Sequence, residues 1–397
     1  MVVFCQHGLA DPLVAPLMLD YVLRLQELAP QREVLFITEE PPGAPISNAL
    51  LARMKEARVT WMPLRYDVRG RQWMQRIANL WRMLRATRRF VRGRSPRWLV
   101  GYLSYGGSYA VLASLLGLGP CAVVCFEPHS RYMVELGIWR RGSMRVRIVA
   151  LLERWQMKYA KALIVPTRAV RTLAMEQAPR GKVVLQAITI DVEAARFSAE
   201  AREELRREYG LGRAITLVYV GKFGGIYHSI DAYLHFLEQL VNVDPDLRFL
   251  VISQAAEIER IRAHALYLRL QDHLVLQPPV PPESLHRYLS AGDLGVVAIP
   301  PTPSQVFRTP VKSAHYWAAG LPLIIPKGVS DDAVIAASDG AGIVVADIPV
   351  ADPTSFIRDV RSLLAGDRDA LRAHCMEVAR KYRDTSNMVV ELHRLFT

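Results

Sequence analysis

Two cations at the start of a short helix are the strongest chemical signal in this chain. Thr309 is a favourable N-cap and Pro310 suits the first helical position, while Gly320 marks the helix end. Arg308 and Lys312 therefore lie at the N-terminal end, where the helix dipole already places positive charge. A phosphate would relieve this conflict by accepting hydrogen bonds from backbone N–H groups and both side chains. The alternative is that both side chains extend into water.

A glycine-rich turn follows the first expected strand of the second half. The strand ends at Gly221, and Gly224 and Gly225 precede a helix that starts near Ser229. Glycines let a ligand approach the backbone closely, and Lys222 can reach a phosphate. The spacing matches neither the nucleotide-triphosphatase P-loop nor the dinucleotide fingerprint, and an ordinary tight turn is the alternative.

Polar side chains also follow a strand in the first half. Glu127, His129 and Arg131 come directly after an apolar run that begins at Cys121. Such groups collect at the carboxyl ends of parallel strands, where ligands bind. Hydrolysis by paired carboxylates is disfavoured because no second acidic residue pairs obviously with Glu127. A loop histidine and glutamate satisfied by their neighbours is the alternative.

Strands and helices alternate along the whole chain and must position these groups. We expect seven strands over residues 2–187 and six over 215–345, which predicts two doubly wound parallel sheets. A charged stretch without strand character separates domain 1–195 from domain 196–368. Helices over 369–397 are expected to pack back on the first domain.

The order of these pieces resembles the GT-B glycosyltransferases, closest to the retaining glycosyltransferase family 4. The family segment Ser-Pro-x-Lys-x-x-Glu-Tyr-x-Ala-x-Gly-x-Pro reads Thr-Pro-Val-Lys-Ser-Ala-His-Tyr-Trp-Ala-Ala-Gly-Leu-Pro over residues 309–322. The resemblance implies two Rossmann-like domains that face a central cleft. It also implies transfer of a sugar, with retention, from a nucleotide diphosphate sugar to a glycan or lipid-linked acceptor, without a metal or cofactor.

The resemblance assigns donor recognition to the second domain. The glycine turn would face the diphosphate, the turn at Val280 would lie beside the nucleobase, and segment 309–322 would hold the diphosphate and ribose. The donor-binding residues implied in this way are Gly221, Lys222, Gly224, Gly225, Val280, Arg308, Thr309, Pro310, Lys312 and His315.

In the first domain, the resemblance implies a loop with His7 and Gly8 that faces the cleft, together with Arg131. We interpret His129 and Glu127 as catalytic candidates that orient the sugar or acceptor and handle a proton.

The chain departs from the family at two positions. Glutamates are common there, eight residues apart, whereas this chain has Phe307 and His315. His315 could bond a ribose with a different reach from glutamate. A catalytically silent partner subunit that binds a nucleotide or glycan is therefore one alternative, and a nucleotide-sugar epimerase is another.

Positive charge is concentrated in the first half. The net charge is +12, and residues 51–100 alone hold 14 basic and 2 acidic residues. A helix expected over 71–92 has an apolar face that includes Ile77 and Trp81, with arginines broadly opposite. We expect an anionic membrane surface as a partner of these arginines rather than nucleic acid, because no nucleic-acid motif is present. The alternative is an ordinary surface helix. The arginines concerned are Arg82, Arg85, Arg88 and Arg89.

Cysteine usage predicts a cytoplasmic protein, and the basic helix would place it on the inner face of a membrane. Cys5, Cys121, Cys125 and Cys375 show no metal-binding spacing and are expected to be buried free thiols. The uncharged stretch 98–126 has the hydropathy of a membrane span, but we expect a strand, a glycine turn at Gly106 and Gly107, a helix and a second strand there. The beginning of the sequence lacks the charged head and apolar core of a signal peptide.

Overall fold

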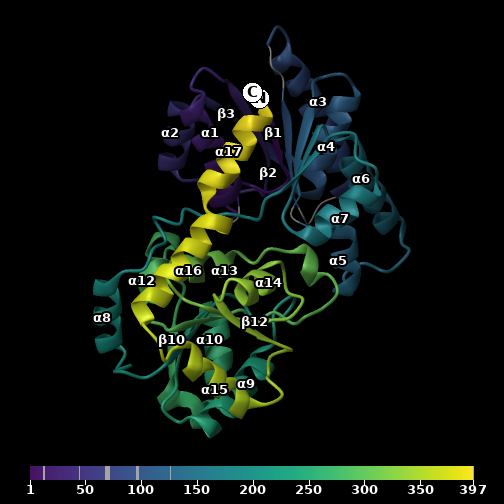
Figure 1. Cartoon of the computed structure of the whole chain (residues 1–397). Coiled ribbons are helices and arrows are strands. Elements are labelled where there is room, and N and C mark those ends of the chain that lie inside the picture. The colour runs from purple at the N-terminus through teal and green to yellow at the C-terminus, as the bar shows by residue number, and fades with distance from the viewer. Residues whose placement is uncertain (12–13, 44, 68–71, 95–97, 126, 397) are drawn as a thin grey trace. The chain divides into compact units, whose positions relative to one another are not determined.

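The chain folds into two compact units (Figure 1). The computed structural model describes residues 1–397 except 12–13, 44, 68–71, 95–97, 126 and 397. The first unit comprises Met1–Ile188 and Thr385–Thr397, and the second comprises Thr189–Asp384. The chain therefore passes from the first unit to the second at residue 188, a few residues before the boundary at 195 that the charge pattern indicated.

Each unit contains one parallel sheet with the strand order of a doubly wound fold. The first sheet has the order β3 (Val59–Arg65), β2 (Val34–Glu40), β1 (Val2–Cys5), β4 (Leu99–Tyr102), β5 (Cys121–Val124), β6 (Ala162–Val165) and β7 (Lys182–Leu185). The second has the order β10 (Leu274–Gln277), β9 (Arg248–Ile252), β8 (Thr216–Val220), β11 (Leu294–Val296), β12 (Leu323–Pro326) and β13 (Gly342–Val345). The expected fold class, α/β with two doubly wound parallel sheets, is confirmed.

Helices connect the strands and cover both sheets. The first unit contains a π-helix (Val14–Leu19), α1 (Asp20–Leu28), α2 (Asn48–Glu56), α3 (Gln72–Val91), α4 (Leu103–Leu115), α5 (His129–Glu135), α6 (Met144–Tyr159), α7 (Arg168–Glu176) and α17 (Thr385–Phe396). The second unit contains α8 (Ala199–Glu208), α9 (Ile230–Val243), α10 (Ala255–Arg262), α11 (Tyr267–Leu270), α12 (Leu285–Ser290), α13 (Val311–Ala318), α14 (Asp332–Ser338), α15 (Pro353–Leu363) and α16 (Arg368–Arg383). Its 3₁₀ turns are Gln271–His273, Pro282–Ser284 and Gln305–Phe307.

The strand order reverses at one place in each sheet. In the first unit the reversal lies between β1 and β4, and in the second between β8 and β11. Ligands of open parallel sheets bind at the carboxyl ends of the strands beside such a reversal. A ligand site is therefore expected at the loops after β1 and β8.

Helix α4 differs from its sequence prediction. We expected a glycine turn at Gly106 and Gly107, but α4 begins at Leu103 and both glycines lie inside it. A Cβ at Gly106 would lie 2.4 Å from the Phe4 carbonyl oxygen, and one at Gly107 would lie 2.8 Å from Val123 Cγ1. The glycines thus allow the helix to approach the sheet closely, and they do not form a turn.

Helix α3 has the expected length, but only part of its expected apolar face is buried. Met83, Thr87 and Val91 are buried, whereas Ile77 and Trp81, which we expected in the core stripe, are 51% and 71% exposed. Leu80 and Leu84 are half-buried, so the expected apolar stripe of α3 is only partly covered.

Polar contacts explain how α3 is oriented. Arg76 forms an ion pair with Glu39 at 3.1 Å, and the Asn79 amide donates to Glu39 and to the Arg65 carbonyl. Glu39 is buried at the end of β2, so these bonds hold the polar side of α3 against the sheet.

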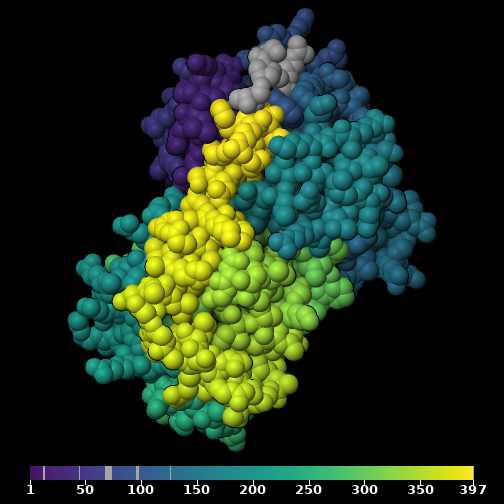
Figure 2. Space-filling view, viewed as in Figure 1, coloured from purple at the N-terminus to yellow at the C-terminus, as the bar shows by residue number. Residues whose placement is uncertain are grey.

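The two C-terminal helices belong to different units. The α16 residues Cys375, Val378 and Ala379 join the core that contains Trp317 of α13, and Figure 2 shows α16 in yellow against the light green of that unit. Helix α17 packs on α1, and its Phe396 ring lies 5.1 Å from that of Trp98. Only α17 of the expected C-terminal segment thus packs on the first unit.

Across the described parts of the chain, no helix combines the length and apolarity needed to span a bilayer.

Candidate functional site

The glycine turn after β8 exposes its backbone. Gly221, Gly224 and Gly225 have φ values of +136°, +75° and +63°, a region that side chains disfavour. The Glu257 carboxylate of α10 accepts a hydrogen bond from the Phe223 backbone N–H at 2.9 Å, which fixes the middle of the turn. Because β8 borders the strand-order reversal, this turn lies where a ligand of the sheet would bind.

Helix α13 begins one residue later than the sequence predicted. Pro310 is the N-cap with ψ +121°, and this extended conformation lets the helix start only at Val311. Thr309 therefore precedes the helix and does not cap it. The Tyr316 hydroxyl accepts a hydrogen bond from the Val220 backbone N–H at 2.9 Å. This bond holds α13 against the end of β8, so the helix and the glycine turn lie side by side.

Lys312, in the first turn of α13, points toward the glycine turn. A Cβ at Gly221 would lie 3.0 Å from Lys312 Nζ. The amine lies 4.5 Å from the ring centre of Tyr219 and 4.4 Å from that of Tyr227. Nζ is buried and has no hydrogen-bond partner among the residues that the structure describes. Burial lowers the pKa of Lys312 to about 7.

Such an amine is costly to bury unless an anion joins it. Buried polar groups are almost always hydrogen-bonded, and a charged group without a partner is especially unfavourable. Ser313 Oγ and Ser330 Oγ, in α13 and in the loop after β12, are likewise buried without a partner in the described part of the chain. The arrangement suits a bound phosphate or diphosphate.

The other expected donor residues differ in exposure. Lys222 is exposed, Arg308 is half-buried just before Thr309, and Val280 packs against the core of the unit. Burial and the nearby Arg383 lower the pKa of His315 to about 4. The His315 imidazole is therefore neutral at pH 7 and can both donate and accept hydrogen bonds.

In the first unit, neighbouring side chains hold His7 in place in the loop after β1. The Gln6 Oε1 atom accepts a hydrogen bond from the Tyr105 backbone N–H, so its amide nitrogen must donate to His7 Nε2 at 3.1 Å. His7 Nδ1 lies 3.0 Å from the Asp11 carboxylate. Gly8 has no room for a side chain, because a Cβ there would lie 2.3 Å from the buried Glu40 carboxylate.

His129 opens helix α5 among aromatic rings. Its ring centre lies 5.2 Å from that of Trp139 and 6.2 Å from that of Tyr105, both edge-on. Glu127 is half-buried just before the helix, and Arg131 is exposed on its first turn. Tyr105 thus lies between the His129 ring and the loop that carries His7.

Buried Glu153 of α6 anchors the start of α5. Its carboxylate accepts hydrogen bonds from the Ser130 backbone N–H at 3.0 Å and from the Ser104 hydroxyl at 3.1 Å. Glu153 therefore orients the helix that begins at His129.

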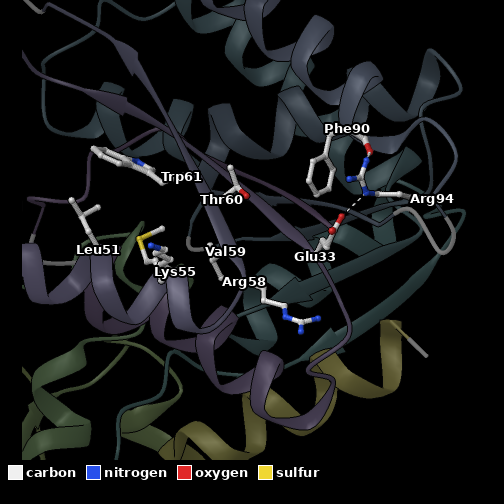
Figure 3. Close-up of a pocket in the computed structure, with 10 residues that line it drawn as sticks. Glu33, Leu51, Lys55, Arg58, Val59, Thr60, Trp61, Phe90 and Arg94 are labelled. Atoms are coloured by element: carbon white, nitrogen blue, oxygen red, sulfur yellow. Dashed lines mark hydrogen bonds and ion pairs between the residues drawn. The ribbon is translucent and has the colours of Figure 1, made fainter.

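A cavity of about 640 Å³ lies elsewhere in the first unit. Figure 3 shows it beside β3, with Trp61, Phe90 and Arg58 in its lining and Arg94 paired with Glu33 at 2.6 Å. Arg58 and Glu33 come just before β3 and β2, so this cavity is at the amino ends of the strands. None of the candidate site residues lines it.

Comparison with known proteins agrees with this geometry. Residues 18–186 match the model of the glycosyl transferase 4-like domain. The match covers β2 to β7 of the first unit, which agrees with the expected resemblance to family 4. No curated protein sequence matches the chain.

Solved glycosyltransferases match the whole chain in structure. HepE of Anabaena in complex with UDP has a TM-score of 0.69 at 10% identity, covering 99% of this chain and 98% of that chain. Sucrose-phosphate synthase of Thermosynechococcus elongatus has a TM-score of 0.71 at 16% identity, covering 100% and 98%. WaaG, a glycosyltransferase of lipopolysaccharide biosynthesis, has a TM-score of 0.61 at 14% identity, covering 100% of both chains.

The chain has the fold of the GT-B glycosyltransferases. The resemblance stated from the sequence is confirmed, and so is the expectation of a glycosyltransferase.

Several residues of this candidate site carry no signal in the sequence. Tyr219 and Tyr227 enclose the Lys312 amine, and Asp332 with Arg383 lies behind α13. A tyrosine on a strand or an arginine at a helix end has many uses, so only the fold shows that they meet here.

Proposed function

We propose that this glycosyltransferase moves a sugar from a nucleoside diphosphate sugar to a glycan or lipid-linked acceptor, with retention. The observation that carries the proposal is the buried Lys312 amine, which lies beside the Gly221 turn without a hydrogen-bond partner in the described chain. A diphosphate would supply that partner. The HepE structures with UDP and with UDP-glucose support this class of donor.

In the proposed reaction the bond between the sugar and the diphosphate breaks as the acceptor oxygen bonds to the same carbon on the same face. The departing diphosphate takes the electron pair and gains negative charge. Lys312, Arg308, Lys222 and the first backbone N–H groups of α13 stabilise that charge. These groups do the electrostatic work that a divalent metal performs in other transferases.

The remaining candidates take supporting roles in this proposal. The glycines of the β8 turn admit the diphosphate to the backbone, Val280 contacts the base and His315 bonds the ribose. In the first unit His129 and Glu127 orient the sugar or acceptor and assist proton transfer, and the loop with His7 and Gly8 contacts the acceptor.

We further propose that the acceptor is presented at the cytoplasmic face of an anionic membrane. Arg82, Arg85, Arg88 and Arg89 of α3 are all exposed, beside the exposed Trp81. The cysteines are free thiols, as a reducing compartment favours.

Helix α6 has a similar exposed side, which is apolar and basic. Met144, Ile148 and Leu151 are exposed at helical spacing, whereas the polar residues Glu153 and Gln156 are buried. The exposed cations on this helix are Arg145, Arg147, Arg154 and Lys158. A basic helix with an outward apolar stripe fits the interface of an anionic bilayer.

The proposed donor chemistry is tested by thermal shift and turnover. A nucleoside diphosphate that binds only the folded chain raises its melting temperature, so a panel of UDP, GDP, ADP and dTDP identifies the base. The matching nucleotide sugars are then assayed for transfer and hydrolysis with the unsubstituted chain and with Lys312→Met. We expect turnover that falls at least tenfold in the variant.

The same assay also tests the two alternative functions, a silent subunit and an epimerase. Binding without any turnover would favour the silent subunit, which His315 in place of the usual glutamate motivates. An epimerised nucleotide sugar formed without acceptor would favour the epimerase.

A further inference from the structure

A buried ion pair lies directly behind the first turn of α13. Arg383, the last residue of α16, and Asp332, the first of α14, have side chains that are 0% and 2% exposed. Arg383 Nη1 donates to both carboxylate oxygens of Asp332 at 2.8 Å. Its Nη2 donates to the Pro310 carbonyl, also at 2.8 Å. One guanidinium thus joins α14 and α16 to the start of α13.

Neither stability nor helix formation accounts for this arrangement. The Pro310 carbonyl already accepts a hydrogen bond from the Ser313 N–H at 3.3 Å, so α13 does not need the arginine to satisfy that group. A cation beside a helix N-terminus is unfavourable by itself, and Asp332 is required to neutralise it. Buried ion pairs contribute little net stability, because removing two charges from water offsets their attraction.

The pair also connects the start of α13 to a backbone bridge. The Arg383 carbonyl accepts a hydrogen bond from the Ile190 N–H at 2.9 Å, and Ile190 pairs with Asp384 as a parallel bridge. Arg383 therefore links Pro310 to the backbone bridge between Ile190 and Asp384. Pro310 lies two residues before Lys312, whose amine needs a defined place to meet a diphosphate.

We propose that Arg383 and Asp332 are positioning residues that fix the start of α13 and thereby place Lys312 for the donor diphosphate. The proposal rests on the proposed function for the role of Lys312. Neither residue touches the donor, and Arg383 acts through the Pro310 carbonyl. Burial lowers the pKa of His315, and the Arg383 guanidinium lowers it further.

Replacing the ion pair with apolar side chains tests whether the pair positions α13 or only stabilises the fold. Arg383→Met alone leaves Asp332 buried without a partner and should lower the melting temperature. In the double variant Arg383→Met with Asp332→Leu, we expect the melting temperature to recover. The bond to Pro310 is still missing, so hydrogen exchange of residues 309–315 should be faster. Affinity for the nucleoside diphosphate selected from UDP, GDP, ADP and dTDP should fall about tenfold or more by calorimetry.

The control is the ion pair of Arg361 with Asp244, 2.6 Å apart in the same unit and joining α15 to the end of α9. Its replacement by Met and Leu should change neither exchange at 309–315 nor nucleotide affinity. Slow exchange at 309–315 or full nucleotide affinity in the Arg383 and Asp332 double variant would overturn the proposal. If the unsubstituted chain binds none of the four nucleotides, the proposed function fails, and the exchange rate of 309–315 still decides the positioning role.

Discussion

At the scale of residues, Lys312 is unusual because its charge depends on what binds beside it. Burial lowers its pKa to about 7, so the amine is partly neutral in the free protein near that pH. A diphosphate stabilises the ammonium form and must raise this pKa. Binding above about pH 7 therefore takes up a proton, and affinity falls as the pH rises from about 7 toward the raised pKa.

Calorimetry of diphosphate binding at about pH 8 in two buffers with different ionisation heats measures this uptake. We expect up to one proton bound per diphosphate, and none in Lys312→Met. Lys222→Met is a matched control, because Lys222 is exposed in the same turn. Equal heats in both buffers for the unsubstituted chain would refute the linkage.

The sequence predicted which residues belong to this site better than it predicted which side chains surround them. The resemblance to family 4 predicted that segment 309–322 and the glycines after β8 face one diphosphate, and Lys312 Nζ does lie beside Gly221. The partners Tyr219 and Tyr227 could not be predicted, since the contact depends on side-chain directions in the folded unit. The same holds for Arg383, which comes more than 70 residues after Pro310 in the chain.

At the scale of elements, glycine has two structural roles that the sequence alone does not distinguish. It can form a turn with a positive φ, or it can let a helix pack closely on a sheet. Gly221 has a positive φ and makes a turn, as expected. Gly106 lies in helix α4, because only a residue without a Cβ fits against the Phe4 carbonyl. In both cases glycine is required, but in the second the requirement comes from a strand distant in sequence.

Replacing Gly106 with alanine tests this account. Alanine normally stabilises a helix by about 1 kcal/mol relative to glycine, whereas a Cβ 2.4 Å from a carbonyl oxygen must displace the helix. Overpacking of this kind costs about 1–3 kcal/mol or more, so the steric effect exceeds the helical preference. We expect Gly106→Ala to lower the melting temperature of the first unit by several degrees.

Leu115→Ala in the same helix provides the control, because Leu115 is 54% exposed and its truncation should change stability by less than about 0.5 kcal/mol. A melting temperature of Gly106→Ala equal to or above that of the unsubstituted chain would mean that α4 does not need the close approach.

At the scale of the whole molecule, the alternation of strands and helices was sufficient to predict both sheets. Apolar runs identified the strands, and connections through helices made them parallel. The orientation of α3 could not be predicted, because the polar bonds of Arg76 and Asn79 to Glu39 override its apolar stripe. The helical wheel placed Ile77 and Trp81 in the core, whereas Asn79, Met83 and Thr87 are buried residues of α3.

The exposure of Trp81 changes what the positive charge of the first unit can do. Residues 1–200 carry 29 basic and 15 acidic residues, against 21 and 23 in the remainder, so the positive charge belongs to the first unit. In α3 this charge surrounds an exposed Trp81, and in α6 it surrounds exposed Met144 and Ile148. Attraction to anionic lipid and insertion of apolar side chains then act together, with about 1 kcal/mol from each basic residue near the surface.

Vesicle sedimentation separates these two contributions. Replacing Arg82, Arg85, Arg88 and Arg89 with Gln should weaken binding to phosphatidylglycerol vesicles at low salt by about a hundredfold or more. Trp81→Gln with Ile148→Gln should weaken binding at high salt as well, because insertion is not screened. Leu268→Gln changes a side chain that is 75% exposed in the second unit and should have no effect. Equal sedimentation of all variants would exclude a membrane role for α3 and α6, while transfer to a soluble acceptor would be unaffected by that outcome.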